Sequence, residues 1–412
     1  MNGWREVTLD ELGTVERGRS RHRPRNDPSL YGSEMPFFQT GDVKAAVLHL
    51  GHPQQWYSAA GVQQSRVWEP GITCITIAAN IADTAVLGER GCFPDSVLGF
   101  TPKDHVDDAY FVKYLLDGHR ETLGAAARGT TQDNLSLEKL LSFRFSVPPV
   151  SERVVIARTL CSIDDLIENN RRRIEVLEEM ARAIYREWFV HFRYPGHETF
   201  PLVDSSLGPV PEGWTVHPFS EVADFVNGFA FKPSHWGNEG RPIVKIKELK
   251  HGVVADTPRC SPKVVDPKFW VERGDLLFSW SADLGVYLWR DEPGLLNQHL
   301  FTVRPKRPGL TLGFLLHALD ESMPQFRSRA QGTTMRHIKR SALSEVEVLL
   351  PDDTLTGRFT RDIEPMHDEI ARLGQESRSL ETMRDLLLPR LVSGQIDLST
   401  LDLTGLLEGA VA

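Results

Sequence analysis

The sequence predicts an α+β protein with two pseudo-repeated, mixed α/β domains separated by two long, antiparallel helices that pair as in a coiled coil. Three observations predict this fold. The two halves of the chain match at a nearly constant offset, short β-type runs alternate with Gly and Pro, and two long segments carry apolar residues at heptad spacing. A chain of 412 residues also exceeds the usual length of about 100–200 residues for one domain.

The repeat is seen in identical residues at a fixed separation. Trp4 and Trp214 open two similar segments that lie 210 positions apart. Further along the offset is 203, and the matching pairs are Glu69 and Glu272, Gly71 and Gly274, Gly91 and Gly294, Pro102 and Pro305, Pro148 and Pro351, Ile167 and Ile370, Leu177 and Leu380, and Met180 and Met383. A constant shift over so long a stretch predicts two copies of one unit of roughly 200 residues.

Each copy begins with a globular part that contains short β-type runs bounded by turn residues. The predicted strands are Met35–Thr40, Ile72–Ala78, Phe143–Val147, Pro242–Ile246, Asp275–Trp280 and Val346–Leu350. Apolar residues at helical spacing predict short helices over Ala109–Leu116 and Leu312–Leu319.

Each copy ends with a helical part that carries a heptad seam. In copy one the seam is Ile156, Leu160, Ile163, Ile167, Asn170, Ile174, Leu177, Ala181, Ile184 and Trp188. In copy two it is Phe359, Ile363, Met366, Ile370, Leu373, Ser377, Leu380, Arg384, Leu387 and Leu391. An isolated helix would expose such a stripe, so we expect the two helices to bury their seams against each other.

Two features of the seams need a separate interpretation. Asn170 either lies buried and fixes the register of the helix pair, or it faces solvent at a frayed point. Pro365 is expected to kink the second helix or to delay its start, because proline lacks the N–H of a helical turn. Asp164 and Asp165 lie beside the first seam and are interpreted as part of a solvated face.

These patterns divide the chain into six segments. They are a first globular domain (1–150), a first long helix (151–190), a linker (191–213), a second globular domain (214–351), a second long helix (352–393) and an acidic C-terminal tail (394–412). The linker is rich in Pro and Gly, which predicts an extended connection.

The composition excludes several classes of protein. The net charge of −9 lies mostly at the carboxyl end, so the two domains are near neutral and can still present basic faces. Four widely spaced cysteines without a CxxC pair argue against a zinc site and fit a reducing cytoplasm. There is no apolar run of about 18 residues to cross a membrane, and the amino terminus does not read as a secretory signal.

The common catalytic motifs are absent. The sequence contains no GxxxxGK[ST] loop, GxSxG elbow, HExxH pair, dinucleotide-binding glycine loop or Asn-Pro-Pro-aromatic tetrapeptide. The fourteen histidines are scattered without metal-ligand spacing. We therefore predict no catalytic residue, no metal site and no cofactor on this chain.

Several motifs together resemble one family over the whole length. They are Gly3-Trp4, GTTQDNLSL at 129–137, VPP at 147–149, SIDDLIENNRRRIEVLEEMARAIYREWF at 162–189, SSLGPVPEGW at 205–214 and LLLPRLVSGQIDL at 386–398. With these motifs and the two-copy layout, the chain resembles the specificity subunit of a type I restriction–modification system.

The resemblance implies a non-catalytic subunit that recognises double-stranded DNA through two target-recognition domains. It implies two methyltransferase subunits docked on the long helices, and restriction subunits that translocate DNA. The complex would act as a DNA adenine methyltransferase and an ATP-dependent endonuclease, with S-adenosylmethionine, ATP and Mg on the partner subunits. The two interruptions of the second seam, Ser377 and Arg384, depart from the first seam's pattern.

The physical interpretation agrees with the resemblance. Two related domains held by paired helices would read two segments of duplex DNA about one helical turn apart, near 34 Å. Because the copies diverge, the predicted target is asymmetric and bipartite, with an unread spacer. The alternatives are a specificity subunit of a methylation-only complex, a coiled-coil scaffold that does not bind DNA, and a chain that itself methylates or cuts DNA.

Candidate DNA contacts come from basic and amide side chains. Arg17, Arg19, Arg21, Arg23 and Arg25 alternate in sequence, which would place all five on one side of an extended chain. The other candidates are Lys245 and Lys247 on a predicted strand, Lys250, Arg336, His337, Lys339, Arg340, Gln39, Thr40 and Gln132. Thr130, Thr131, Thr333 and Thr334 are interpreted as turn residues, and Trp236 and Trp280 as core residues rather than as side chains that wedge into DNA.

Overall fold

A computed structural model describes residues 3–103, 105, 107–127, 135–254, 256–332 and 337–396. The chain forms two compact units. The first unit combines the described residues up to Arg172 with those from Leu373 onward, and the second consists of Arg173–Arg372. Each unit therefore contains one globular part of the repeat together with a portion of both long helices.

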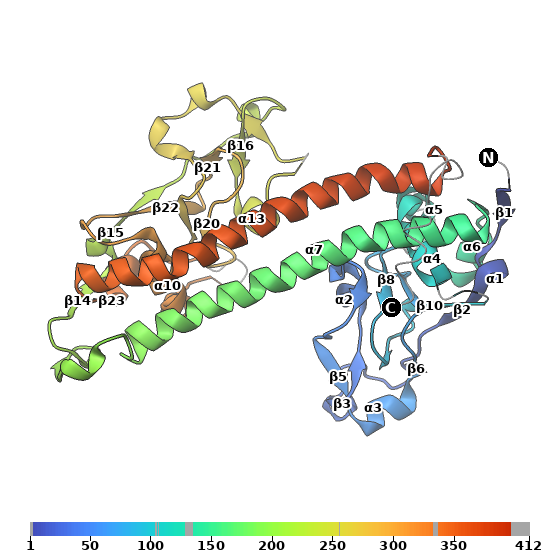
Figure 1. Cartoon of the computed structure of the whole chain (residues 1–412), viewed down its shortest axis with the longest axis horizontal. Helices are drawn as coiled ribbons and strands as arrows, with labels where there is room; N and C mark the ends of the chain where they lie inside the picture. Colours follow the sequence, from blue (N-terminus) through green and yellow to red (C-terminus); the bar gives the residue numbers. More distant parts are fainter. Residues whose placement is uncertain are drawn as a thin grey trace. The chain divides into compact units, whose positions relative to one another are not determined.

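The first unit is built on a five-stranded sheet in the order β2-β10-β7-β8-β4 (Figure 1). The strands are β2 (Gly13–Arg17), β10 (Val97–Pro102), β7 (Thr73–Thr76), β8 (Thr84–Leu87) and β4 (His49–Leu50). The helices of this part are α1 (Leu9–Leu12), α4 (Asp107–Gly118), α5 (Arg120–Ala127) and α6 (Leu137–Leu141). Every residue of β7 and β8 is buried, as expected for strands covered on both faces.

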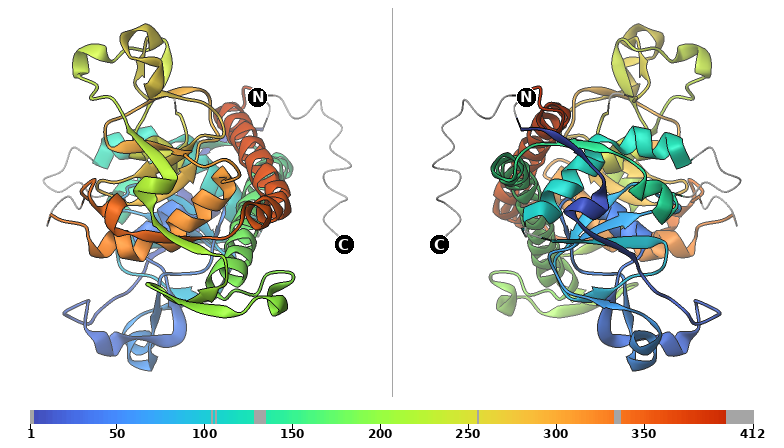
Figure 2. Two further views of the ribbon diagram at one scale, coloured as in Figure 1. Left: turned by 90° about the vertical axis from the view of Figure 1, so that its left-hand side faces the viewer. Right: turned by 90° about the vertical axis from the view of Figure 1, so that its right-hand side faces the viewer.

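A second, smaller sheet in the first unit has the order β5-β3-β9-β6. Its strands are β5 (Gln55–Tyr57), β3 (Tyr31–Phe37), β9 (Gly91–Cys92) and β6 (Val67–Trp68), and its neighbours are η1 (Pro28–Leu30), α2 (Thr40–Ala45) and α3 (Ala59–Gln64). It has its own small core of Leu30, Phe37, Tyr57 and Cys92. Figures 1 and 2 show that β3, β5 and α3 lie farther from the long helix α7 than the five-stranded sheet does.

The second unit repeats this architecture, except that its main sheet has four strands in the described residues, with no counterpart of β4. Its main sheet has the order β15-β22-β19-β20, and its smaller sheet the order β17-β16-β21-β18. The strands are β15 (Ala223–Asn227), β22 (Leu300–Pro305), β19 (Leu276–Ser279), β20 (Gly285–Leu288), β17 (Arg259–Cys260), β16 (Arg241–Val244), β21 (Gly294–Leu296) and β18 (Trp270–Val271). The helices are α8 (Phe219–Val222), α9 (Ile246–His251), α10 (Leu312–Glu321), α11 (Met323–Ser328) and α12 (Ala342–Glu345), with short turns η4 (Pro233–His235), η5 (Pro262–Val264) and η6 (Pro267–Phe269).

The strand registers confirm the predicted duplication. Leu98 pairs with Ile75 in the first unit, and Phe301 pairs with Phe278 in the second, so both partners are shifted by the same 203 positions. A short strand pair also recurs in each unit: β1 (Arg5–Val7) with β11 (Phe145–Val147), and β14 (Thr215–Pro218) with β23 (Glu347–Leu350).

The long helices are α7 (Val150–Tyr185), which continues into the π-helical turn η2 (Arg186–Val190), and α13 (Asp353–Val392). All predicted seam residues are buried or half-buried. In the first unit Leu160 of α7 shares a core with Leu391 and Val392 of α13, whereas in the second unit the ring of Tyr185 packs on Phe359. The start of each helix therefore meets the end of the other, which makes the pair antiparallel within each unit and confirms the predicted fold class.

Asn170 is only 3% exposed, so its burial is confirmed, its role in fixing the register stays a prediction, and the solvent-facing interpretation is wrong. Pro365 does not delay α13, which begins at Asp353 and continues past it. Because Pro365 is exposed, the carbonyl left without its helical partner can bind water, while buried Ile363 and half-buried Met366 hold the turn in place. No helix in the described ranges is both long and apolar enough to span a bilayer.

The linker between the copies is more structured than predicted. It contains the turn η3 (His197–Thr199) and a hairpin of β12 (Leu202–Ser205) and β13 (Gly208–Pro211). Gly208 has a φ of +97°, a value that glycine adopts without steric cost, and this allows the tight reversal. The prediction of an extended connection was therefore wrong for residues 202–211.

Candidate nucleic-acid interface

The first part of the arginine segment follows the predicted alternation. Arg17 ends β2, and Arg19 and Arg21 follow it in the next stretch of chain. All three are exposed, whereas Gly18 and Ser20 between them are buried. Alternating exposure places three guanidinium groups on one solvent-facing side, and the described residues provide no acidic partner for any of them.

Hydrogen bonds with Gln64 and Ser65 hold the backbone of this segment, whereas the side chains of Arg17, Arg19 and Arg21 remain exposed. Ser20 forms a β-bridge with Ser65, whose hydroxyl donates to the carbonyl of Arg19 at 2.7 Å. The Oε1 atom of Gln64 accepts from the backbone N–H groups of Arg21 and His22. The arginines are thus presented by a rigid backbone, which lowers the entropic cost of holding a phosphate.

The alternation ends after Arg21, so the prediction that all five arginines share one extended face was wrong. Arg23 lies in a bend and donates to the carbonyls of Ser20 and His22. Arg25 lies in a turn and forms two hydrogen bonds to Asp95, at 2.7 and 2.8 Å. The carboxylate neutralises most of this charge, so Arg25 is a weaker candidate for phosphate contact.

The equivalent segment of the second unit has a different character. Gly18 and Gly228 occupy the same backbone position. The N–H of Gly18 donates to the carbonyl of Val97, and the N–H of Gly228 donates to the carbonyl of Leu300, the residue 203 positions after Val97. The residues after Gly228 are aromatic, and Phe229 packs on Phe231 with ring centroids 5.1 Å apart. One position of the fold thus carries a charged surface in one unit and an aromatic cluster in the other.

Lys245 and Lys247 do not lie on a strand, so the strand predicted for these two lysines was wrong. Strand β16 ends at Val244, and Lys245 stands at the start of helix α9. The Nζ atom of Lys245 lies 4.5 Å from the ring centroid of Trp236. Lys247 binds Asp256 at 2.9 Å and Lys250 pairs with Asp283, so carboxylates neutralise both of these lysines.

The candidate Gln39 of the first unit forms a contact that the sequence did not predict. The Nε2 atom of Gln39 donates to the Oε1 atom of Gln55 at 2.6 Å, and both side chains are exposed. Thr40 is the first residue of α2 and is half-buried. Gln55 opens strand β5, at the edge of the smaller sheet.

The basic residues after Gln331 differ in the hydrogen bonds and ion pairs that they form. His337 forms backbone bridges with Gln331 and Ser281. Arg340 donates to the carbonyl of Phe225 at 3.2 Å, whereas Lys339 is exposed and has no ionic partner within the described part of the chain. The other predicted residues of this group, Gln132, Thr130, Thr131, Thr333, Thr334 and Arg336, lie outside the described residues.

The two tryptophans behave differently. Trp236 is 48% exposed, so its interpretation as a core residue was wrong. Trp280 is partly buried against the main core of the second unit, and its Nε1 atom donates to Asn227 at 3.2 Å. Trp236 is therefore the more exposed of the two, and the ammonium of Lys245 lies over its ring.

Asp164 is fully buried, and its interpretation as part of a solvated face was wrong. Its carboxylate accepts from Nη1 of Arg384 at 2.9 Å and from the Tyr114 hydroxyl at 2.7 Å. Burial and the nearby carboxylate raise the pKa of Tyr114 far above its usual value. Arg384, which interrupts the second seam, thus joins α13 to α7 in the first unit.

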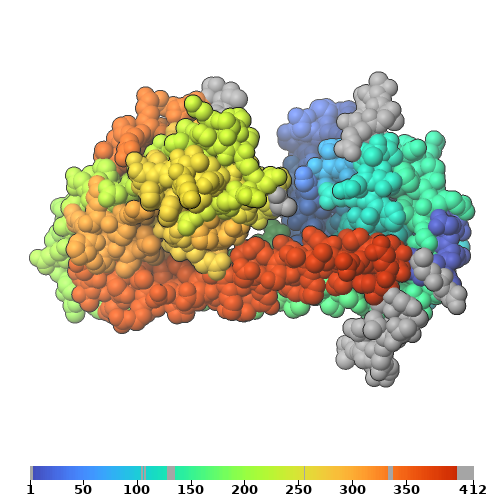
Figure 3. All heavy atoms as spheres, turned by 90° about the horizontal axis from the view of Figure 1, so that it is seen from above, coloured from blue at the N-terminus to red at the C-terminus, as the bar shows by residue number. Residues whose placement is uncertain are grey.

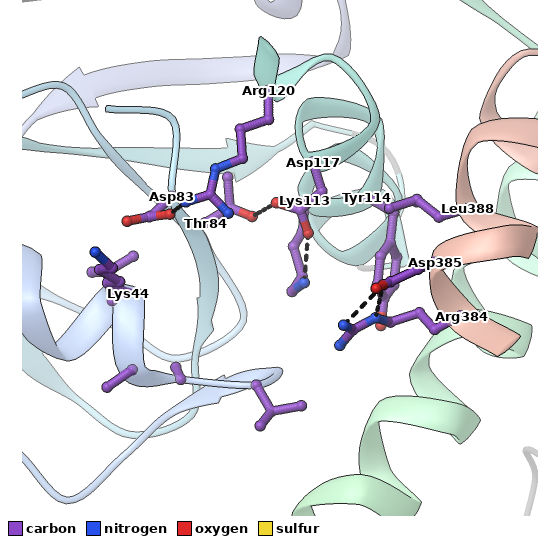
Figure 4. Close-up of a pocket in the computed structure, with 14 residues that line it drawn as sticks. Lys44, Asp83, Thr84, Lys113, Tyr114, Asp117, Arg120, Arg384, Asp385 and Leu388 are labelled. Carbon is purple, nitrogen blue, oxygen red and sulfur yellow. Dashed lines mark hydrogen bonds and ion pairs between the residues drawn. The ribbon is translucent and has the colours of Figure 1, made fainter. Parts of the chain in front are cut away.

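A cavity of about 430 Å³ lies beside this contact in the first unit (Figure 4). Lys113 donates to Asp117 at 2.8 Å inside it, and Asp117 also accepts from Thr84. Arg120 pairs with Asp83 on the other wall. The cavity is therefore lined by ion pairs next to the end of α13, and the buried Oδ2 atom of Asp83 has no hydrogen-bond partner among the described residues.

The second unit carries a histidine pair at the equivalent place. His317 and His367 are shifted by 203 positions from Tyr114 and Asp164, and their Nε2 atoms lie 3.3 Å apart. Burial, together with the neighbouring imidazole and Arg182, lowers the pKa of His317 to about 3. Burial and the charge of Arg290 lower the pKa of His367 to about 4. Both imidazoles are therefore neutral at pH 7, and one donates a hydrogen bond to the other.

Duplicated α/β domains, each packed on portions of two antiparallel helices, define a protein class that presents two related but chemically distinct surfaces. Comparisons with known proteins identify its family. The type I restriction modification DNA specificity domain matches residues 1–179 and 211–354. The chain is 21% identical to the type I restriction enzyme MjaIX specificity subunit of Methanocaldococcus jannaschii, over 95% of this chain and 93% of that protein.

Two further comparisons agree. The type I restriction enzyme HindI specificity subunit of Haemophilus influenzae is 20% identical, over 96% of this chain and 100% of that protein. The crystal structure of a type I restriction–modification S subunit from M. genitalium has the same fold, with a TM-score of 0.59 and 15% identity over 94% of this chain and 96% of that one. The chain belongs to the family of type I restriction–modification specificity subunits, which confirms the resemblance seen in its motifs.

Proposed function

We propose that this chain is the DNA-reading, non-catalytic subunit of a type I restriction–modification complex, and that each unit reads one half of an asymmetric, bipartite target. The observation that carries the proposal is the duplicated fold with different side chains at equivalent positions, exposed arginines in the first unit and half-buried phenylalanines in the second. The first unit has Arg19 and Arg21 where the second has Phe229 and Phe231. Related scaffolds with different surfaces are what two different half-sites require.

The helix pair is proposed to set the length of the unread spacer. A buried heptad seam makes each helix a stiff element, and a rise of about 1.5 Å per residue converts helix length directly into separation. Half-sites on one side of B-DNA are spaced near 34 Å, about one turn. Inserting one heptad near Ile174 together with one near Ser377 should lengthen the spacer and leave both half-sites unchanged.

The helix surfaces are proposed to dock two methyltransferase subunits. In the first unit Leu166, Met383 and Leu386 are exposed by 50%, 44% and 59%, although each lies on a long helix. In the second unit Val176 and Met180 are exposed by 57% and 46%. Figure 3 shows that the part of α13 after Leu373 is uncovered on the face in view. Large apolar side chains on an open helix face are typical of a protein interface.

The chemistry is proposed to reside on the partners. S-adenosylmethionine would bind to the methyltransferase subunits, and ATP and Mg to restriction subunits that move DNA. The experiment that tests the subunit's role is a domain exchange. Residues 214–351 are replaced by the matching segment of another specificity subunit, and methylated positions are mapped in DNA exposed to the assembled complex. The proposal expects one half of the target to change; a change in both halves, or in neither, would contradict it.

A further inference from the structure

The two units place different polar side chains at one equivalent backbone position. In the first unit Gln39 follows β3, and its N–H donates to Asp42 at 2.7 Å. In the second unit Lys245 follows β16, and its N–H donates to Glu248 at 3.1 Å. In each case an acidic side chain three residues ahead accepts the bond. The backbone of both residues is therefore held in the same way, and only the side chain differs.

The side-chain amide of Gln39 can form two hydrogen bonds to one base edge, one as donor and one as acceptor. Its Nε2 atom carries two hydrogens, and one of them is used by Gln55 at 2.6 Å. The remaining hydrogen and the Oε1 atom form a donor–acceptor fork in an exposed side chain. The major-groove edge of adenine offers the complementary pair, an N6 donor and an N7 acceptor. The bond to Gln55 fixes the amide plane in advance, so less rotamer entropy is lost on contact.

Lys245 is prepared to make a different contact. Its ammonium lies 4.5 Å from the ring centroid of Trp236, which is itself 48% exposed. Carboxylates neutralise the neighbouring Lys247 and Lys250, but no described carboxylate pairs with Lys245. A free ammonium donates to two acceptors at once, and guanine presents two acceptors, O6 and N7, on its major-groove edge.

We infer that Gln39 and Lys245 are specificity-determining residues, which read an adenine in the first half-site and a guanine at the corresponding position of the second. Gln55 and Trp236 act as positioning residues for them. This inference rests on the proposed function, because it requires that both units read DNA. It adds the identity of one base in each half and the residue responsible for it.

The test exchanges the two side chains in the intact chain, assembled with its methyltransferase subunits. Methylated sites are mapped by single-molecule sequencing for Gln39→Lys, Lys245→Gln and the double variant. Gln39→Lys should change one adenine of the first half-site to guanine, and Lys245→Gln should make the reverse change in the second half-site. A correct two-point contact is worth about 1–3 kcal/mol, so the base preference at that one position should shift by about fivefold to 150-fold.

Controls separate base reading from general effects. Gln54→Lys adds a charge beside Gln55, and Lys263→Gln removes an exposed lysine of the second unit; both should leave the target unchanged. Gln39→Ala and Gln55→Ala should relax only the adenine position, which covers the case in which Gln39→Lys does not fold. An unchanged target in folded variants, or equal weakening at all sequences, would overturn the inference. A wild-type complex without a bipartite target would instead overturn the proposed function.

Discussion

At one position of the repeated fold the first unit buries an aspartate beside an arginine, and the second unit pairs a buried histidine with a half-buried one. Asp164 contacts Arg384 and Tyr114, whereas His367, at the equivalent position, contacts His317. Both arrangements satisfy a buried polar side chain at the junction of a short helix with the long ones. The fold thus requires that polar groups be paired there, and it does not prescribe their charge.

The largest effect is expected from breaking the charged junction. Arg384→Ala leaves the carboxylate of Asp164 buried without its strongest partner, which should destabilise the first unit by about 3 kcal/mol. Urea unfolding followed by hydrogen exchange in α4 measures this loss. The double variant Asp164→Leu with Arg384→Met removes both charges and should return close to wild-type stability. A single variant as stable as wild type would show that the charge is already compensated by Lys113.

The neutral junction should respond to pH and not to salt. The histidines have pKa values of about 3 and 4 in the folded state, below the ordinary value near 6.5. Below pH 6.5 the unfolded chain therefore binds protons that the folded chain excludes, and stability falls as the pH falls. At pH 5 burial of His317 alone should cost the second unit about 2 kcal/mol.

Hydrogen exchange in α10 at pH 7 and pH 5 measures this dependence. The variant His317→Gln with His367→Gln keeps a polar pair without a titratable group, and its exchange should depend less on pH. Equal pH dependence in the variant would assign the effect to other groups.

A smaller effect is expected from making the two seams alike. Asn170 corresponds to Leu373 at the 203-residue offset, and its buried Nδ2 atom has no hydrogen-bond partner among the described residues. Asn170→Leu should therefore stabilise the first unit by about 1 kcal/mol, seen as a higher Tm. It should also broaden the range of accepted spacers, because a buried amide specifies register. A lower Tm would mean that the amide is satisfied in solution.

The smallest effect on stability is expected at the surface. Arg19→Gln removes an exposed, unpaired charge and should leave stability unchanged, while it lowers the slope of log binding constant against log salt by about 1. Arg25→Gln removes a charge that Asp95 already neutralises, so its effect on the slope should be smaller. Equal slopes for both variants in DNA-binding titrations would contradict the distinction between free and paired arginines.

The repeat, the fold class and the helix seams were predictable because they depend on periodic apolar positions and on identity at a constant offset. The same offset could also have pointed to the two junctions, since Tyr114 and His317 lie 203 positions apart. The repeat was recognised from identical residues, and the residues of the two junctions are not identical, so the junctions were not predicted. Asp164 was misjudged since its nearest contacts are distant in sequence, and a local pattern cannot show a partner 220 residues away.

The candidate interface was predicted less completely. Alternation identified Arg17, Arg19 and Arg21, but not the bend that removes Arg23 and Arg25 from the row. The contact of Gln39 with Gln55 depends on the pairing of β3 with β5, which propensity does not reveal. Lys245 was placed on a strand because the preceding residues favour β structure, and the change to helix α9 is set by the carboxylate of Glu248.

The membership of Leu391 and Val392 in the core of the first unit has a consequence for synthesis of the chain. A ribosome delivers the second unit whole, since that unit is a single continuous stretch, Arg173–Arg372. The unit made first must wait, with Leu160 and its neighbours uncovered, until the last helical turns emerge. The order of translation and the order of completion are therefore reversed, and chains truncated after Arg372 should be cleaved by protease first in the half that was made first.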